Sequence, residues 1–170
     1  AFRMERSGAS ITVADINPDM LGVGMERAAE RGIDTLVWSE QNAERLSFPD
    51  QFFDAYTIAF GIRNVTDIPA ALAEAHRVLR YGGRFFCLEF STNEWPGFAQ
   101  AYDAYSHHLV PRLGKLIADD EDSYRYLIES IRRFPPMPAF AQMIRDAGFT
   151  AVKVEPILGG LVAIHSGWKA

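Results

Sequence analysis

Apolar and polar positions alternate along the first half of the chain in a way that predicts strands and helices in turn. Short β-branched or aromatic runs predict strands at 11–15, 35–39, 53–60 and 84–90. Apolar residues at helical spacing predict helices at 17–32 and 67–79, each opened by a capping side chain, Asn17 or Asp67. We expect the strand at 11–15 to be buried and the strand at 84–90 to be buried on both faces. Such alternation predicts a parallel, doubly wound α/β sheet.

The pattern changes in the second half of the chain. Helical spacing predicts three helices, at 98–109, 123–133 and 139–147. Two strands follow, at 151–157 and 161–166, and the pair Gly159–Gly160 between them is a hairpin signal. A sheet that ends in an antiparallel hairpin is not the usual dinucleotide-binding fold. It resembles the class I S-adenosylmethionine methyltransferases, which are Rossmann-like.

Composition narrows the choice of function. A chain of 170 residues suits a single domain, which we place at 1–170, and its net charge of −5 gives no reason to expect nucleic acid as a partner. The one cysteine, Cys87, lies in an apolar run and is expected in the core. No apolar run reaches the roughly 18 residues of a membrane span, although contact with a membrane surface stays open. The histidines lack the spacing of metal ligands, so we expect no metal.

Polar side chains stand where the predicted strands end, which is where ligands bind in a doubly wound sheet. Asp15 could accept hydrogen bonds from a ribose diol, or it could merely assist the helix cap at Asn17. Asn42 and the backbone of Ala43 could meet the edge of an adenine, or they could form a surface turn.

The third strand end is "AFGIRNV". Gly61 allows a close backbone approach, and Arg63 and Asn64 bring a cation and an amide to the same edge. For a lone arginine the commoner explanation is a salt bridge on the rim of the sheet. Three polar strand ends together favour a nucleotide-type site.

The stretches "NAERLSFPDQFFDAYTIAFGIRNVTD", "HRVLRYGGRFFCLEFS", "SYRYLIESI" and "GGLVAIHSGWK" resemble the ubiquinone/menaquinone biosynthesis C-methyltransferases over nearly the whole chain. That resemblance implies S-adenosylmethionine as the cofactor and a polyprenylated benzoquinol or naphthoquinol as the methyl acceptor. It implies cofactor contacts at Asp15 for the ribose, Asn42 and Ala43 for the adenine, and also at Ile16, Ala59 and Phe60. It implies Arg63 and Asn64 as catalytic residues, and a helical insertion at about 98–135 that covers the substrate, with Tyr102, Tyr105, Ser123 and Tyr124 near the quinol.

The same resemblance raises an expectation about the start of the chain. Strand 11–15 corresponds to the family's second strand, so its first strand and glycine-rich loop are expected to be missing from these 170 residues. We therefore expect the chain by itself to bind no S-adenosylmethionine, to be inactive, and to form a homo-oligomer or strand-swapped dimer.

Arginine stays protonated in proteins, so Arg63 is expected to stabilise a quinol phenolate electrostatically rather than to act as the base. Three other functions remain open: a methyltransferase for another phenolic molecule, a non-catalytic member of a quinone-synthesis complex, and a nicotinamide-dependent dehydrogenase, which the terminal hairpin disfavours. We expect a cytoplasmic protein at the inner face of the membrane, or a protein of the mitochondrial matrix in a eukaryote.

Overall fold

The structure is a computed structural model that describes residues 1–5, 8–91 and 121–170 of the chain. The chain divides into two compact units, Ala1–Phe48 and Pro49–Ala170. The expectation of a single domain over 1–170 stays a prediction. The helix predicted at 98–109 lies outside the described residues.

The first unit is a parallel pair of strands packed against one helix. Strand β1 (Ile11–Asp15) pairs with β2 (Leu36–Glu40), and α2 (Pro18–Ala29) connects them, after a short helix α1 (Phe2–Glu5). Asn17 caps α2 as predicted, because its side chain accepts hydrogen bonds from the backbone N–H groups of Asp19 and Met20. A Cβ at Gly24 would lie 2.5 Å from the Trp38 ring, so close packing of α2 on β2 requires glycine there.

The expectation that strand 11–15 is buried is wrong. The first three residues of β1 are half-buried, and Ala14 and Asp15 are exposed. Within the described residues β1 pairs with β2 alone, so it stands at the edge of a two-stranded sheet.

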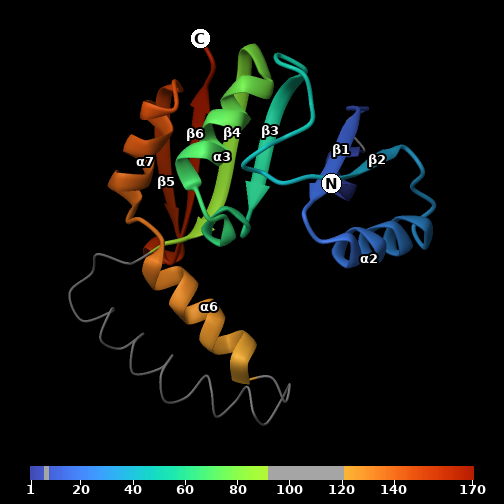
Figure 1. Cartoon of the computed structure of the whole chain (residues 1–170), viewed down its shortest axis with the longest axis horizontal. Helices are drawn as coiled ribbons and strands as arrows, with labels where there is room; N and C mark the ends of the chain where they lie inside the picture. Colours follow the sequence, from blue (N-terminus) through green and yellow to red (C-terminus); the bar gives the residue numbers. More distant parts are fainter. Residues whose placement is uncertain (6–7, 92–120) are drawn as a thin grey trace. The chain divides into compact units, whose positions relative to one another are not determined.

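The second unit is built on a four-stranded sheet of order β3-β4-β6-β5 (Figure 1). Its strands are β3 (Phe53–Ala59), β4 (Leu79–Phe90), β5 (Thr150–Ile157) and β6 (Val162–Trp168). Strands β3 and β4 are parallel, whereas β6 runs antiparallel to both of its neighbours. The turn η3 (Leu158–Gly160) joins β5 to β6. The C-terminal hairpin is therefore confirmed.

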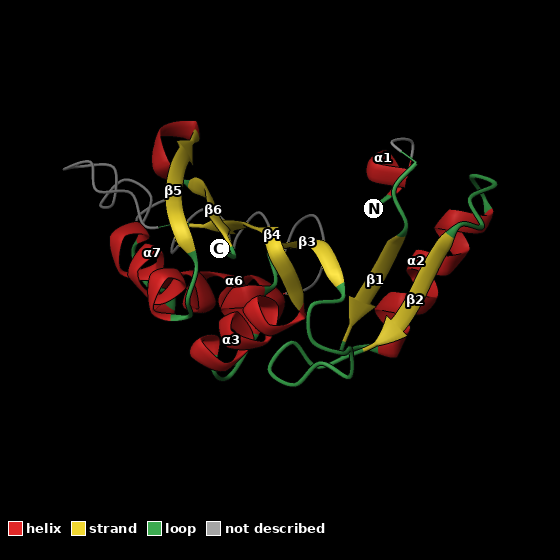
Figure 2. Cartoon of the chain, turned by 90° about the horizontal axis from the view of Figure 1, so that it is seen from above, coloured by secondary structure: helices red, strands yellow, loops and turns green. Residues whose placement is uncertain are grey.

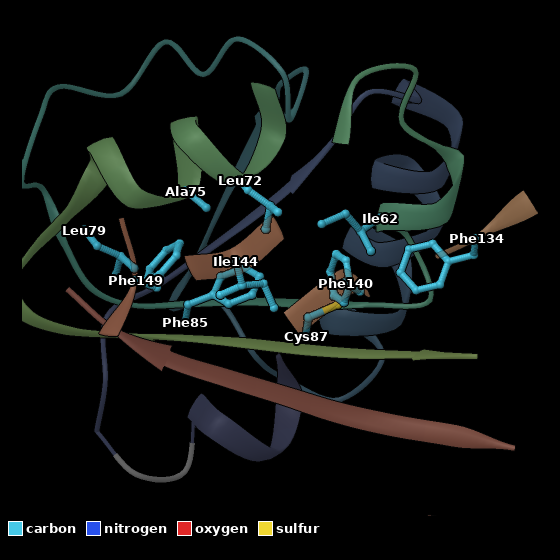
Figure 3. Packing of buried hydrophobic residues seen from close by; sticks show 10 residues of the cluster. All are labelled: Ile62, Leu72, Ala75, Leu79, Phe85, Cys87, Phe134, Phe140, Ile144 and Phe149. Atoms are coloured by element: carbon cyan, nitrogen blue, oxygen red, sulfur yellow. The ribbon is translucent and has the colours of Figure 1, made fainter. Parts of the chain in front are cut away.

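Helices α3 (Ile68–Val78), α6 (Glu121–Arg133) and α7 (Met137–Asp146) lie on one side of this sheet (Figure 2). Apolar side chains from the helices meet those from the sheet in one buried cluster (Figure 3). In β4, Phe85, Cys87 and Glu89 are buried, but the alternate residues Phe86 and Leu88 are half-buried. Cys87 is a core residue, as predicted, whereas the strand is fully buried on one face rather than on both. None of the described helices is long and apolar enough to cross a membrane.

Candidate functional site

In the first unit, the carboxyl ends of β1 and β2 bring two of the predicted cofactor residues to one edge. The backbone N–H of Gln41 donates a 2.9 Å hydrogen bond to the carbonyl of Asp15, which ties the turn after β2 to the end of β1. The Oδ1 atom of Asp15 accepts a 2.9 Å hydrogen bond from the backbone N–H of Asn17. The predicted assistance to the helix cap is thus present. It engages one carboxylate oxygen of an exposed side chain, which leaves the other oxygen available to a ligand. The neighbouring Ile16 is 64% exposed.

Asn42 and Ala43 lie in a tight turn directly after β2. Asn42 Oδ1 accepts a 2.9 Å hydrogen bond from the backbone N–H of Glu44, so its amide oxygen serves the turn. The side-chain NH₂ of Asn42 is then the part that could donate to a ligand. Leu46, which follows, is buried at 8% exposure. The surface-turn interpretation and the adenine interpretation are compatible with this geometry.

In the second unit, β3 ends at Ala59 and the chain turns sharply into the 3₁₀ turn η1 (Ile62–Asn64). Phe60 adopts a positive φ of 54°, which is unusual for a residue with a side chain. Its backbone N–H donates 2.9 Å to the carbonyl of Leu88, and its ring packs 4.8 Å from the ring of Phe90. These contacts hold the turn at the carboxyl ends of β3 and β4.

Arg63 is held in this turn by a buried ion pair. Its Nη1 lies 3.0 Å from Oε1 of Glu89, and the two side chains are 9% and 1% exposed. The expected salt bridge exists, but the commoner interpretation placed it on the rim and the structure buries it. Nη1 also donates to the carbonyl of Phe60 at 2.5 Å, and Nε donates to Oγ of Ser130 at 3.3 Å. The guanidinium lies over the Phe90 ring, 5.5 Å from its centroid.

Asn64 is exposed beside Arg63 and contacts helix α6. The hydroxyl of Tyr126 donates a 3.1 Å hydrogen bond to Asn64 Oδ1. A hollow of about 340 Å³ opens here, between η1 and α6. It is lined by Arg63, Asn64, Val65, Thr66, Ile68, Tyr126, Glu129, Ser130, Arg133 and Phe134. A cation, an amide and a phenol thus surround a space of the size that a small ring compound occupies.

The predicted substrate residues fall on the margin of the described chain. Tyr102 and Tyr105 lie outside the described residues. Ser123 and Tyr124 belong to the first turn of α6, and their side chains lie outside the described part.

Sequence reasoning missed Glu89, Ser130 and Tyr126. A signal existed for Glu89, because it is the one charged residue among the apolar positions 85–90. The other two residues lie on α6, and no local sequence pattern shows that α6 packs beside η1.

A family model and the sequences of curated proteins show the family of this chain. The model of the ubiE/COQ5 methyltransferase family matches residues 2–169. A Zymomonas mobilis protein named "Ubiquinone/menaquinone biosynthesis C-methyltransferase UbiE" is 63% identical over 169 residues, which are 99% of this chain and 70% of that protein. An Arabidopsis thaliana protein named "2-methoxy-6-polyprenyl-1,4-benzoquinol methylase, mitochondrial" is 60% identical over 94% of this chain and 56% of its own length. The chain thus spans a little over half to about 70% of these two relatives.

Solved structures agree on the fold. A Thermotoga maritima protein described as an S-adenosylmethionine-dependent methyltransferase matches with a TM-score of 0.62 at 22% identity, over 92% of this chain and 72% of that one. An N-methyltransferase from Haemonchus contortus, solved with S-adenosylhomocysteine, matches with a TM-score of 0.70 at 11% identity, over 99% of this chain and 46% of its own. The class I methyltransferase fold is therefore confirmed.

Proposed function

The chain belongs to the ubiE/COQ5 methyltransferase family, and from this membership we propose that the protein of the complete reading frame methylates a ring carbon of a polyprenylated benzoquinol or naphthoquinol. That these 170 residues by themselves bind no S-adenosylmethionine and are inactive stays a prediction. The names of the bacterial and plant relatives, which mention ubiquinone, menaquinone and a polyprenyl benzoquinol, support the substrate class. The observation that supports the chemistry best is the buried cation of Arg63 beside Asn64, at the edge of a hollow of about 340 Å³.

The residues of the first unit fit S-adenosylmethionine. The exposed carboxylate of Asp15 has one oxygen beyond its bond to Asn17, and a carboxylate at a strand end suits a ribose diol. The free NH₂ of Asn42 suits an acceptor nitrogen of adenine. Ile16 and Ala43 would add contacts around them.

S-adenosylmethionine, when bound, supplies an electrophilic methyl group on a sulfonium. The acceptor carbon becomes nucleophilic when the hydroxyl ortho to it gives its proton to water. Arg63 stays protonated and stabilises the resulting phenolate, because its charge sits in a protein site shielded from solvent. Asn64 orients the ring oxygen through its amide. The ring carbon would form the new C–C bond as the methyl–sulfur bond of the sulfonium breaks, which leaves a neutral thioether, and the carbon's own hydrogen would then leave to solvent as a proton.

The test uses protein expressed from the complete reading frame with labelled S-adenosylmethionine. Reduced demethylmenaquinone and a reduced 2-methoxy-6-polyprenylbenzoquinone are offered separately, and a simple phenol serves as the comparison. We expect a labelled methyl on a quinol ring carbon, and loss of that product in Arg63→Ala with cofactor binding retained. Equal methylation of the simple phenol would support the broader phenol methyltransferase, and cofactor binding without any transfer would support a non-catalytic role.

Two proposals on partners follow from the same substrate. A polyprenyl tail partitions into lipid, so we propose that the protein contacts the membrane surface without spanning it. The predicted helix at 98–109, whose aromatic residues Phe98, Tyr102 and Tyr105 would meet the lipid, lies outside the described residues. Self-association is the second proposal, supported by the edge positions of β1 and β3 in their sheets. Flotation with liposomes and light scattering test these two proposals, and a monomer that never floats would contradict both.

A further inference from the structure

Glu89 is an acid in a strand whose neighbours are apolar. It stands next to the last residue of β4 and is 1% exposed. On its strand it follows Phe85 and Cys87 on the face that meets the helices. Burying a carboxylate is costly unless charge and hydrogen bonds compensate, so its contacts should explain why it is there.

Among the described residues, three of the four hydrogen bonds that Glu89 accepts come from Arg63. Glu89 Oε1 lies 3.0 Å from Arg63 Nη1, and Oε2 lies 3.3 Å from the same atom. Oε2 also accepts from the backbone N–H of Arg63 at 3.4 Å. Oε1 accepts in addition from the backbone N–H of Phe90 at 2.9 Å. One carboxylate therefore holds both the backbone and the guanidinium of Arg63, while its own position is fixed by the end of β4.

The contacts with Glu89 determine which N–H donors of the Arg63 guanidinium stay available to a ligand. A guanidinium has five N–H donors, one on Nε and two on each terminal nitrogen. Nε donates to Ser130, and Nη1 donates to Phe60 and Glu89. Nη2 has no partner among the described residues, and the side chain lines the hollow beside α6. The pattern leaves the two N–H donors of Nη2 for a ligand.

We propose that Glu89 is a positioning residue for methyl transfer: it fixes Arg63 so that Nη2 donates to the ring oxygen of the quinol as that oxygen becomes a phenolate. The inference rests on the function proposed above. A donor that is already in place costs no reorganisation when charge develops in the substrate. Stability alone is a weak reason for a buried ion pair, since packed apolar residues serve as well or better.

The test compares Glu89→Gln with Glu74→Gln in protein from the complete reading frame. Glu74 pairs with Arg77 at 2.6 Å and lies outside the hollow, so it controls for the loss of any Glu–Arg pair in this unit. We expect Glu89→Gln to lower kcat at least about tenfold with S-adenosylmethionine affinity unchanged. We also expect the apparent pKa that governs kcat to change, because Glu89→Gln both releases the guanidinium from its fixed position and removes a negative charge from the neighbourhood of the phenolate. Glu74→Gln should leave both quantities as they are.

Two further measurements separate positioning from mere folding. In an Arg63→Lys background, Glu89→Gln should lower kcat less than about twofold, because its effect acts through the guanidinium. The Nε–H resonance of Arg63 in ¹⁵N-labelled protein should move in Glu89→Gln and stay in place in Glu74→Gln, whatever the turnover. If Glu89→Gln fails to fold, Glu89→Asp keeps the charge and withdraws it by one methylene, so it should show the same effects to a smaller degree.

The results of these experiments distinguish a failure of this inference from a failure of the proposed function. A wild-type protein that methylates the quinol, with an unchanged kcat and pH profile in Glu89→Gln, would overturn this inference and leave the proposed function intact. An equal loss in the wild-type and Arg63→Lys backgrounds would assign Glu89 a structural role and also overturn it. A wild-type protein that methylates no quinol would overturn the proposed function and this inference with it.

Discussion

The hydroxyl of Tyr126 donates a 3.1 Å hydrogen bond to Oδ1 of Asn64, 62 residues earlier in the chain. This bond joins helix α6 to the turn η1 and determines how the Asn64 amide is presented. Because Oδ1 already accepts from Tyr126, the NH₂ group is the half of the amide left to donate to a ligand. The Asn64 NH₂ group can therefore donate a hydrogen bond to a developing oxyanion, and Arg63 can stabilise the same oxyanion with its positive charge.

Tyr126→Phe should weaken catalysis without unfolding the protein. The variant keeps the ring, which is 57% exposed, and removes one hydrogen bond. A bond of this kind contributes about 0.5–1.5 kcal/mol, so we expect kcat to fall roughly two- to tenfold with cofactor affinity unchanged. Tyr81→Phe is the matched control, since Tyr81 is 68% exposed and lies outside the hollow. Equal kcat values for the two variants would show that the Tyr126 hydroxyl does not orient Asn64.

Lys169→Met should destabilise the second unit. Lys169 is 6% exposed, and its ammonium donates 2.8 Å to the carbonyl of His76 and 3.4 Å to that of Arg77. These carbonyls lie in the last turn of α3, where no helical N–H follows to satisfy them. Methionine keeps the apolar stem and loses the donors and the charge, so we expect a loss of about 1–3 kcal/mol in unfolding free energy.

Urea unfolding of the two proteins measures that loss. Lys153→Met on the edge strand β5 is the control, because Lys153 is exposed and its replacement should change stability by less than about 0.5 kcal/mol. A change of the same size in both variants would mean that Lys169 does not cap α3.

The elements of the chain were predictable where a local signal was strong. Asn17 and Asp67 cap their helices as expected, because capping depends on a few adjacent residues. The hairpin between β5 and β6 follows equally from the pair Gly159–Gly160. The exposure of β1 was not predictable, since a β-branched run has the same composition at a sheet edge as in a sheet centre.

The sequence predicted which strand ends carry polar side chains, but it did not predict how those side chains pair. Strand ends pointed to Asp15, Asn42 and Arg63, because ligands bind at the carboxyl edge of such sheets. Burial of the Arg63–Glu89 pair depends on how η1, β4 and α6 pack together, and sequence spacing contains no such distance. An acid within an apolar strand was nevertheless a signal that a buried partner existed.

Stability should decrease as the pH falls below the ordinary histidine value. Burial lowers the pKa of His165, and this effect outweighs the hydrogen bond between its Nε2 atom and the Met137 carbonyl, which raises the pKa. Burial also lowers the pKa of His76, and the nearby Lys169 adds to that effect. In the unfolded chain these histidines bind protons near pH 6.5, whereas in the folded chain they are still unprotonated at that pH. The stabilisation is therefore complete above 6.5 and is lost as the pH falls towards the lower folded values.

Unfolding free energies at about pH 8 and about pH 5.5 measure this effect. His165→Gln should reduce the difference between the two, because the side chain at this position no longer titrates. The ring is 1% exposed and its Nδ1 has no hydrogen-bond partner among the described residues, so protonation there is the costlier of the two. An undiminished difference in the variant would assign the acid sensitivity to other groups.

Asp15→Ala should weaken S-adenosylmethionine binding in protein from the complete reading frame. The carboxylate has one oxygen engaged by the backbone of Asn17, and the other is proposed to accept from the ribose. Loss of a charge-assisted hydrogen bond costs about 1–3 kcal/mol, which calorimetric titration would record as a weaker dissociation constant. Turnover at saturating cofactor should suffer less, because Asp15 is assigned to binding rather than to the developing phenolate. Asp34→Ala, an exposed acid of the same unit, is the control for the loss of one negative charge. Equal affinities for the two variants would remove Asp15 from the cofactor site and reduce it to a residue that supports the cap of α2.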